Sequence, residues 1–392
     1  MMTNAEVHTA IIGAGHAGVE CACALRSFGV QGPIALISDE AHAPYERPPL
    51  SKALLLGATD VTRIVLRSEA VFEKLGLIRI QGDPVETLDP RTHTLGTRSG
   101  RTLRFAHAVL ATGAIARGLP GLQGEGVYAV RNADDSLLLR AALAPGGRLL
   151  VVGGGYLGLE AASSAAKLGV AVTVLEAADG IMPGKVSPLT AERFAAMHRG
   201  AGIELVHGAA VQSWRRTEGQ WHATLADGRV YRAPAVLVAI GAVANTSLAE
   251  RAGIACQGGV VVDAACRTSA PDIYAVGDCS IGYRRELGLS MRIESVQNAM
   301  AQARIAACAI AGKAPTPERV PTFWSEQHGC RLQMAGMVHP GRPCHDEMID
   351  TPRGWIVERR QEGRLVAVEA VDSPAEFVRA VQRLNAVWQE PA

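Results

Sequence analysis

Short apolar runs alternate with glycine turns and alanine-rich segments along the chain, and one order of positions occurs twice. In residues 8–40 an apolar run leads into a glycine turn, an alanine-rich segment that ends at glycine, a second apolar run and an acidic pair. Residues 147–179 repeat this order, with one acidic residue closing the second run. Apolar runs bounded by glycine, on either side of a helix-length segment, are typical of a strand–helix–strand unit. The pattern predicts two such units.

The C-terminal part of the chain has a different pattern. Polar and apolar positions alternate through residues 354–371, which predicts a hairpin of strands. Residues 373–388 have helical spacing and begin with a capping box, Ser373 followed three positions later by Glu376. Residues 322–392 are therefore expected to form a separate α+β domain.

The first glycine turn has the spacing of a dinucleotide-binding fingerprint. Gly13 permits the tight turn, Gly15 lets a diphosphate approach the backbone, and Gly18 lets the helix pack closely on the strand. The helix then presents its positive N-terminal end to the phosphates. Asp39 and Glu40 follow the second apolar run, where a carboxylate can bind a ribose hydroxyl.

The second turn repeats the fingerprint with Gly153, Gly155, Gly158 and Glu176. A single match would be weak evidence, but two complete fingerprints predict that the chain binds two dinucleotides. No Lys or Arg occurs at positions 177–179 to receive a 2′-phosphate. The second site is therefore expected to prefer NADH over NADPH.

Length and charge narrow the class of protein. The 392 residues are enough for two or three domains. With 39 basic and 38 acidic residues the net charge is +1, and no long basic run is present that could bind nucleic acid. No signal peptide is recognisable and the apolar stretches are too short to span a bilayer. We expect a cytoplasmic protein with no nucleic-acid or membrane partner.

The eight cysteines include no CxxC motif and no paired metal-ligand spacing. They are expected to be buried small hydrophobic residues. Neither a metal site nor a disulfide framework is predicted.

Residues 44–52, Pro-Tyr-Glu-Arg-Pro-Pro-Leu-Ser-Lys, combine three prolines with three charges. Because proline fixes φ and disfavours helix at the preceding residue, a stiff, extended loop is expected around Pro48 and Pro49. Ser51 is expected to cap a short helix after the loop.

Seven motifs in this order carry a family resemblance: GAGHAG, PYERPPLSK, ATG, GGGYLGLE, YAVGDC, RIESVQNA and FWSEQ. From Thr9 to about Val368 the chain resembles the FAD-dependent, NADH-using ferredoxin reductases of ring-hydroxylating dioxygenases and bacterial cytochrome monooxygenases, the putidaredoxin-reductase-like family. These are similar in fold to apoptosis-inducing factor. The resemblance implies an α/β fold with two Rossmann-like dinucleotide-binding domains of the glutathione-reductase type and a C-terminal α+β domain.

Domain boundaries follow from the segments that the resemblance assigns to one ligand. Residues 1–113 and 246–321 are expected to bind FAD, and the inserted residues 114–245 to bind NADH. Residues 322–392 form the third domain, expected over the flavin's acceptor side.

The resemblance also assigns site residues. Lys52 is expected beside the flavin, paired with Glu160, where its positive charge stabilises the reduced flavin. Arg47 is expected near the FAD phosphates or adenine, and Asp278 near the ribityl chain with a helix N-terminus behind it. The remaining cofactor residues implied by the resemblance are Thr112, Gly113, Arg117, Glu294, Val296 and Trp324.

Three departures from the family pattern are visible. Thr322 stands where many relatives have a tryptophan, which puts the identity of the partner in doubt. Ile115 and Ala116 interrupt a common arginine-containing pattern, although Arg117 is kept. Gly180 replaces an arginine that often follows the NADH-ribose acid.

The expected activity is transfer of a hydride from NADH to FAD, followed by passage of single electrons to a two-iron two-sulfur ferredoxin that feeds an oxygenase. The docking is expected to be transient and electrostatic, with the chain a monomer or homodimer. Small ferredoxins are typically acidic, so a basic docking face is predicted from Arg284, Arg285, Arg292 and Arg304.

Three other functions share this scaffold. A disulfide reductase or NADH oxidase needs a catalytic cysteine beside the flavin, and residues 41–52 contain none. A reductase of rubredoxin or another carrier is compatible with the motifs. A non-enzymatic NADH-sensing flavoprotein is the third possibility.

Overall fold

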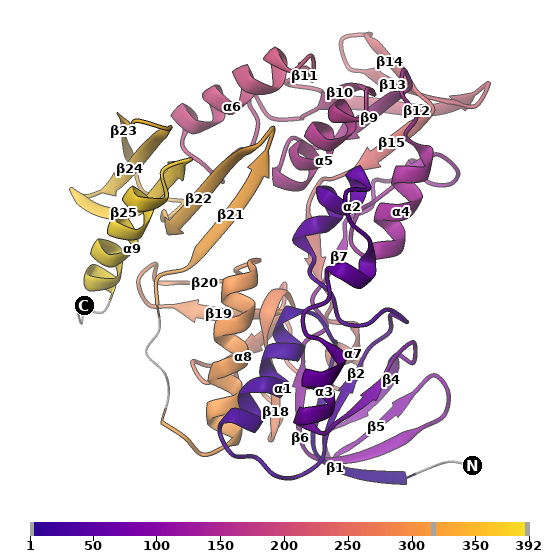
Figure 1. Ribbon diagram of the computed structural model, residues 1–392, viewed down its shortest axis with the longest axis vertical. Helices are drawn as coiled ribbons and strands as arrows, with labels where there is room; N and C mark the ends of the chain where they lie inside the picture. The colour runs from indigo at the N-terminus through magenta and orange to yellow at the C-terminus, as the bar shows by residue number, and fades with distance from the viewer. Residues whose placement is uncertain (1–3, 315–318, 389–392) are drawn as a thin grey trace.

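The computed structural model describes residues 4–314 and 319–388. In Figure 1 the N-terminal strands and the orange helix α8 form the lower body, residues near 120–245 form the upper right, and the C-terminal sheet stands at the upper left. The predicted fold class is confirmed, because a mostly parallel and an entirely parallel sheet of dinucleotide-binding type are followed by an antiparallel sheet with one helix.

The first sheet has the strand order β3-β2-β1-β6-β5-β4, with β18 also paired to β6. Its parallel strands are β1 (Asn4–Ile12), β2 (Ile34–Ile37), β3 (Leu77–Ile80), β6 (Thr102–Leu110) and β18 (Ile273–Ala275). Two antiparallel strands, β4 (Val85–Asp89) and β5 (Thr94–Thr97), extend it beyond β6. Helices α1 (His16–Ser27) and α8 (Val296–Ile310) pack together on one face.

The elements around this sheet complete the lower body. Helix α7 (Ser247–Arg251) lies against β4. A small separate sheet has the order β17-β19-β20 and contains β17 (Val260–Val262), β19 (Ser280–Arg284) and β20 (Leu289–Met291).

The second sheet is entirely parallel and has the order β11-β10-β9-β15-β8. Its strands are β8 (Val127–Tyr128), β9 (Arg148–Val152), β10 (Ala171–Leu175), β11 (Glu204–Val206) and β15 (Ala235–Val238). The helices of this part are α4 (Ala133–Ala142), α5 (Tyr156–Lys167) and α6 (Pro188–Gly200). An antiparallel meander sits beside them, made of β12 (Val211–Thr217), β13 (Gln220–Leu225) and β14 (Val230–Ala233).

Two short strands connect the two parts of the chain. β7 (Ala114–Ala116) leads into the second part and β16 (Ala242–Ala244) leads out of it. The two strands pair in antiparallel fashion, with Ala114 opposite Ala244. The outgoing and returning chain therefore pass side by side.

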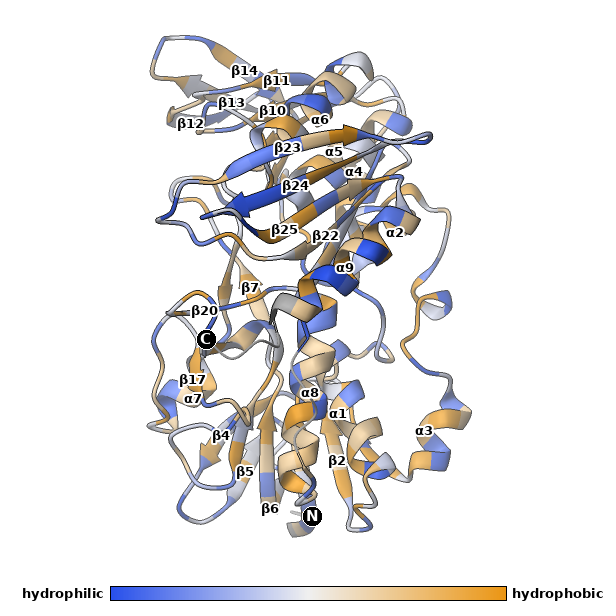
Figure 2. Ribbon diagram, turned by 90° about the vertical axis from the view of Figure 1, so that its left-hand side faces the viewer, coloured by the Kyte–Doolittle hydropathy of each residue, from blue (hydrophilic) through white to orange (hydrophobic). Residues whose placement is uncertain are grey.

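The C-terminal sheet is antiparallel, with the order β21-β22-β25-β24-β23. It contains β21 (Thr322–Gln327), β22 (Cys330–Gly336), β23 (His345–Asp350), β24 (Trp355–Gln361) and β25 (Arg364–Val371). Helix α9 (Pro374–Trp388) packs on β22 and β25. The predicted hairpin and helix are confirmed, and Figure 2 shows the contrast between hydrophobic β25 and the hydrophilic stretch of β24.

The proline-rich segment adopts a different local structure from the one expected. Pro48–Ser51 form a 3₁₀ helix, η1, followed by α2 (Ala53–Leu56), η2 (Val61–Arg63) and α3 (Glu69–Leu75). The prediction of an extended backbone at Pro48 and Pro49 was therefore wrong. Proline has a φ value that also suits the first turn of a helix, where its missing N–H is not needed.

This segment packs against the second part of the molecule, although it belongs to the first part in sequence. Its side chains share one apolar cluster with α4, α5, β9 and β10; they are Tyr45, Leu50, Leu54, Leu55 and Ile64. In Figure 1 α2 accordingly lies beside α4 and α5.

Candidate functional site

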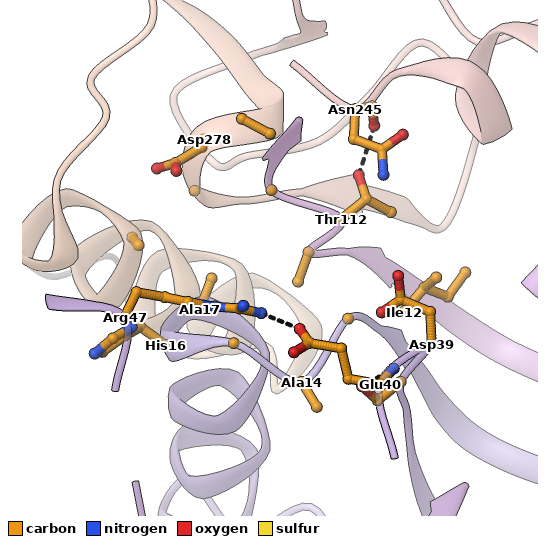
Figure 3. A pocket seen from close by; sticks show the side chains of 18 of the residues that line it. Ile12, Ala14, His16, Ala17, Asp39, Glu40, Arg47, Thr112, Asn245 and Asp278 are labelled. Carbon is orange, nitrogen blue, oxygen red and sulfur yellow. Dashed lines mark hydrogen bonds and ion pairs between the residues drawn. The ribbon is translucent and has the colours of Figure 1, made fainter. Parts of the chain in front are cut away.

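A cavity of about 450 Å³ lies at the carboxyl ends of β1, β2 and β6. Ten of the residues predicted to bind FAD line it: Gly13, Gly15, Asp39, Glu40, Arg47, Thr112, Gly113, Asp278, Glu294 and Val296. Figure 3 shows several of these side chains around one space, contributed by segments far apart in the sequence. Gly18, Arg117 and Trp324 are not among the residues that line this cavity.

The first glycine turn has the geometry that a bound diphosphate needs. Gly13 has φ +112°, and a Cβ on it would stand 2.1 Å from the carbonyl oxygen of Ala111. A Cβ on Gly18 would stand 1.9 Å from the carbonyl oxygen of Gly13, so α1 can approach the turn only with glycine there. Gly15 has nothing within 4 Å of its missing Cβ and lies at the N-terminus of α1. Open backbone at a helix N-terminus fits the diphosphate of FAD.

Arg47 reaches this cavity within a small polar network. Its guanidinium forms an ion pair with Glu40, and it donates hydrogen bonds to the Tyr45 hydroxyl at 2.7 Å and to the Arg131 carbonyl at 3.0 Å. The Tyr45 hydroxyl donates to Glu40 and accepts from the backbone N–H of Ala133 at 2.8 Å. Burial raises the pKa of Tyr45. The network therefore joins the end of β2, the proline-rich segment and the start of α4. Figure 3 shows its Arg47–Glu40 ion pair.

Asp278 lies across the cavity and pairs with Arg131 Nη2 at 3.3 Å. It belongs to a 3₁₀ turn, η3 (Gly277–Cys279), which leads into β19 and not into a helix. Besides α1, helix α8 has its N-terminus at the cavity, and Ser295 caps it by accepting from the backbone N–H of Asn298. The helix expected behind Asp278 does not follow it in sequence, and η3 contacts α8 instead.

His16, the first residue of α1, also lines the cavity. Burial, and then the nearby Arg47 charge, lower its pKa from 6.5 to about 4. His16 is therefore neutral at pH 7 and adds no charge beside the glycine turn.

Thr112 and Glu294 are also held by neighbours at the cavity. The Thr112 hydroxyl donates to the Asn245 carbonyl at 2.7 Å, an interaction drawn in Figure 3. Glu294 pairs with Arg292 at 2.6 Å. The two chain segments that connect the first and second parts thus contribute directly to the cavity wall.

Lys52 and Glu160 form the ion pair that the resemblance implies. Lys52 Nζ lies 2.5 Å from Glu160 Oε2, and the Glu160 side chain is 8% exposed. Glu160 also accepts from the Ser51 hydroxyl at 2.6 Å and from the Ser325 hydroxyl at 2.7 Å. Ser51 thus binds this carboxylate, and the expectation that it caps α2 was wrong, since Lys52 occupies the N-cap position. The carboxylate joins the proline-rich segment, α5 and β21.

Trp324 lies next to this ion pair. The Lys52 ammonium is 5.0 Å from the centre of its ring, and the Arg331 guanidinium is 5.4 Å from it. Lys52 and Trp324 both line a second cavity of about 290 Å³. The preceding residue, Phe323, lines the first cavity instead, because successive side chains of a strand point to opposite faces.

The second glycine turn repeats the first. Gly153 has φ +106°, and a Cβ on Gly158 would stand 2.2 Å from the Gly153 carbonyl oxygen. Glu176 accepts from the backbone N–H groups of Gly154 at 2.6 Å and of Ala178 at 2.9 Å. The carboxylate is thereby fixed beside the turn, with lone pairs left for a ribose hydroxyl. This arrangement fits the adenosine half of NADH.

Several cavity residues lie outside the sequence motifs. Arg131 and Asn132 come from the start of α4, and Asn245 from the end of the second connection. Nothing in their local sequence marks them, because they reach the cavity only through the tertiary fold. Tyr45 and Phe323 could have been found, since Tyr45 belongs to the proline-rich motif and Phe323 to FWSEQ.

The predicted basic face is only partly available. Arg304 pairs with the buried carboxylate of Glu20 at 2.7 Å, and Arg292 pairs with Glu294. Arg284 is partly buried and donates to Asn298 at 3.3 Å, whereas Arg285 is exposed. Arg117 is exposed just after β7.

The described ranges, 4–314 and 319–388, contain no group of three or more His, Cys, Asp or Glu side chains that could hold a metal ion. No helix within them has both the length and the apolar character needed to cross a membrane.

Comparison with known families agrees with this geometry. Residues 7–303 match the pyridine nucleotide-disulphide oxidoreductase family, and residues 322–390 match the reductase C-terminal domain. These two matches cover the two dinucleotide-binding sheets and the antiparallel sheet described above.

Individual relatives cover almost the whole chain. The chain is 38% identical over 379 residues to the 5,5′-dehydrodivanillate O-demethylase ferredoxin reductase subunit of a Sphingobium species, covering 94% of this chain and 91% of the relative. It is 35% identical over 375 residues to a rubredoxin-NAD(+) reductase of Pseudomonas putida, covering 93% and 95%. The solved covalent putidaredoxin reductase–putidaredoxin complex matches with a TM-score of 0.92 and 32% identity, covering 98% and 94%. The predicted family is confirmed: the chain belongs to the pyridine nucleotide-disulphide oxidoreductase family, in the group that carries a reductase C-terminal domain.

Proposed function

We propose that the chain is an FAD-dependent NADH:ferredoxin oxidoreductase that serves an oxygenase. The observation that carries the proposal is the Lys52–Glu160 pair, which joins the proline-rich segment at the first cavity to the helix that follows the second glycine turn. Relatives that match over nearly the full chain are named as ferredoxin reductase components of oxygenase systems.

Each part of the chain has a separate role in this reaction. Bound FAD supplies the redox chemistry, which is uptake of a hydride from NADH and release of single electrons. The turn at Gly13 and Gly15 and the N-terminus of α1 hold the FAD diphosphate, and Arg47 adds positive charge at the same cavity. The turn at Gly153 and Gly155 holds the diphosphate of NADH.

Lys52 and Glu160 are the catalytic pair in this proposal. The buried carboxylate fixes the ammonium in place through a 2.5 Å contact, so the positive charge is already oriented before electrons arrive. Water is largely excluded from this pair, which strengthens its field. Trp324 contacts the same ammonium from the second cavity and borders the path towards the acceptor.

The domain assignment remains a proposal: residues 1–113 and 246–321 bind FAD, 114–245 bind NADH, and 322–392 form the C-terminal domain. The antiparallel pairing of β7 with β16 supports the two boundaries near 114 and 245. The proline-rich segment is the exception, since residues 45–64 share the core of the NADH domain.

Glu176 is proposed to select NADH over NADPH, because its fixed carboxylate repels a 2′-phosphate. Replacing Glu176 with Arg and Ala177 with Ser is expected to raise the KM for NADH and to admit NADPH. The ratio of kcat/KM for the two nucleotides is the measurement. An unchanged ratio contradicts the ribose role.

The partner is proposed to be an iron–sulfur ferredoxin that docks transiently through charge. Of the predicted arginines, Arg285 and Arg304 are exposed, but Arg304 pairs with Glu20, so Arg285 is the best candidate for this contact. We propose a cytoplasmic protein that works as a monomer or homodimer. A relative named as a rubredoxin reductase supports rubredoxin as a second candidate acceptor.

A disulfide reductase is less well supported. None of the described residues lining the first cavity is a cysteine. Cys279 is adjacent, but it is fully buried, and burial raises the pKa of its thiol. A low-pKa, accessible thiol is what thiol–disulfide chemistry requires.

The deciding experiment is an anaerobic titration of the purified, yellow protein with NADH and separately with NADPH, followed by addition of a two-iron two-sulfur ferredoxin or rubredoxin. Bleaching by NADH and rapid reoxidation by the ferredoxin support the proposal. A flavin that neither nucleotide reduces refutes it, and preferential reoxidation by rubredoxin selects the second acceptor.

A further inference from the structure

An exposed lysine, Lys185, lies beside the second glycine turn and has no role in the function proposed above. Lys185 extends along the turn, and its Cε lies 4.0 Å from the position that a Cβ on Gly155 would occupy. Its ammonium lies 5.7 Å from the centre of the Tyr156 ring. Lys185 is exposed, and among the described residues it forms no ion pair with a carboxylate. A free ammonium thus stands beside the N-terminus of α5.

The position of this ammonium depends on how its backbone is held. The Lys185 carbonyl accepts from the Tyr156 hydroxyl at 3.2 Å, and its N–H donates to the Met182 carbonyl at 3.0 Å. Met182 has φ +49°, is fully buried, and donates its N–H to the Gly154 carbonyl at 2.8 Å. The segment 181–187 is therefore attached to the middle of the glycine turn.

The other end of this segment is attached to the C-terminal domain. The N–H of Ser187 donates to Glu369 Oε1 at 2.6 Å, and its hydroxyl donates to Glu369 Oε2 at 2.7 Å. Glu369 is 2% exposed and pairs with Arg359 at 3.2 Å. The hydrophobic side chains of the segment pack against the same sheet, in one cluster that contains Ile181, Met182, Val186, Leu332 and Val371.

We propose that Lys185 binds the diphosphate of the nicotinamide dinucleotide at the second glycine turn, and that Glu369 is the positioning residue that holds the segment carrying it. This inference rests on the proposed function. A lysine acts on phosphate as a point charge, and it adds to the partial positive charge of the helix N-terminus. Lys185 thus supplies the positive charge that Gly180 does not.

The C-terminal domain thus has a role in nucleotide binding. Glu369 lies in β25, on the same sheet as Trp324 in β21. A carboxylate of the third domain therefore determines the placement of a cation in the second domain.

The first test uses the FAD-loaded protein, with NAD⁺ binding measured by titration calorimetry at two salt concentrations. Lys185→Gln is expected to raise the Kd for NAD⁺ about tenfold and to weaken its salt dependence, with the flavin content and the limiting rate of flavin reduction unchanged. Lys74→Gln, which removes an exposed lysine on α3, is the matched control and should leave the Kd within about twofold. Wild-type affinity and salt dependence in Lys185→Gln overturn the inference.

The second test separates positioning from stability. Glu369→Gln is expected to raise the Kd for NAD⁺ about fivefold while the limiting reduction rate stays constant, and to add little in a Lys185→Gln background. Glu358→Gln is the control, because Glu358 is also buried in this sheet but pairs only with Arg360 and Arg383 of the same domain. Ser187→Ala provides a smaller disturbance of the same contact. Equal effects of Glu369→Gln and Glu358→Gln on the Kd, or an additive double variant, overturn the positioning role.

The same experiments distinguish this inference from the proposed function. If the wild-type flavin is not reduced by NADH although NAD⁺ binds through Lys185, the proposed function fails alone. If NADH reduces the wild type normally and Lys185→Gln binds NAD⁺ as the wild type does, this inference fails alone.

Discussion

Replacing Gly158 with alanine should weaken binding at the second dinucleotide site and leave binding at the first site unchanged. The added Cβ stands 2.2 Å from the Gly153 carbonyl oxygen, so α5 and the turn must move apart by at least 0.8 Å to reach 3.0 Å. The new methyl group has little other room, because its Cβ would also stand 3.2 Å from Val151 Cγ1 and 3.3 Å from Ala239 Cβ. The strain therefore falls on the turn that holds the diphosphate.

The expected magnitudes follow from this displacement. Overpacking of this kind costs about 1–3 kcal/mol, and alanine returns about 1 kcal/mol through its higher helix propensity. The net loss in the free energy of unfolding should be about 0–2 kcal/mol. Hydrogen bonds to a charged phosphate contribute about 1.5 kcal/mol or more each, so losing two of them raises the Kd for NAD⁺ roughly 100-fold.

Calorimetric titration with NAD⁺ measures the affinity, and thermal unfolding followed by circular dichroism measures the stability. The visible spectrum provides an internal control, since the first glycine turn is untouched and FAD should remain bound. Gly180→Ala is the matched variant: nothing lies within 4 Å of its new Cβ, and NAD⁺ binding should be unchanged. If Gly158→Ala binds NAD⁺ within about threefold of the wild type, the close approach of helix and turn is not required for binding, and the reasoning is refuted.

Three further predictions follow from other contacts. Lys52→Met leaves a buried carboxylate without its cation, so the free energy of unfolding should fall by up to about 3 kcal/mol; an unchanged thermal midpoint contradicts this. Burial lowers the pKa of His198 from 6.5 to about 4. Between pH 6.5 and pH 4 the unfolded chain therefore binds a proton at His198 that the folded chain does not bind. The free energy of unfolding should fall as the pH drops through this range. His198→Asn should flatten this pH dependence, and an equally steep fall would exclude His198 as its source. Arg285→Glu should slow ferredoxin reduction mainly at low ionic strength, and equal slowing at high salt would argue against a docking charge.

The parts of the fold that sequence patterns predicted are those that local residues determine. The two glycine turns require particular spacings, because Gly18 packs on the carbonyl of Gly13 and Gly158 on that of Gly153, each within one turn and its helix. The C-terminal hairpin shows as a period of two for the same reason. Such signals survive in a single sequence because they do not depend on distant contacts.

The parts that were missed or mistaken depend on tertiary contacts. The Pro48–Ser51 stretch is compatible with both extended and 3₁₀ backbone, and burial of Leu50 against α4 and α5 accompanies the 3₁₀ conformation. The Ser51 hydroxyl binds Glu160, a partner 109 positions away, in preference to capping a helix. Arg131 and Asn245 reach the first cavity for reasons that no local pattern records.

The paired connection of β7 with β16 has a consequence for how such a protein can be rebuilt by evolution or by engineering. Because Ala114 and Ala244 are neighbours in the pairing register, the intervening segment begins and ends at almost one point. A segment with adjacent ends can be exchanged for that of a relative without altering the length of the host chain. Leu54 and Leu55 limit this freedom, since a transplanted segment must bury two side chains that the host supplies. Grafts that carry residues 44–66 with them should therefore succeed where exchange of 114–245 alone produces an insoluble chain.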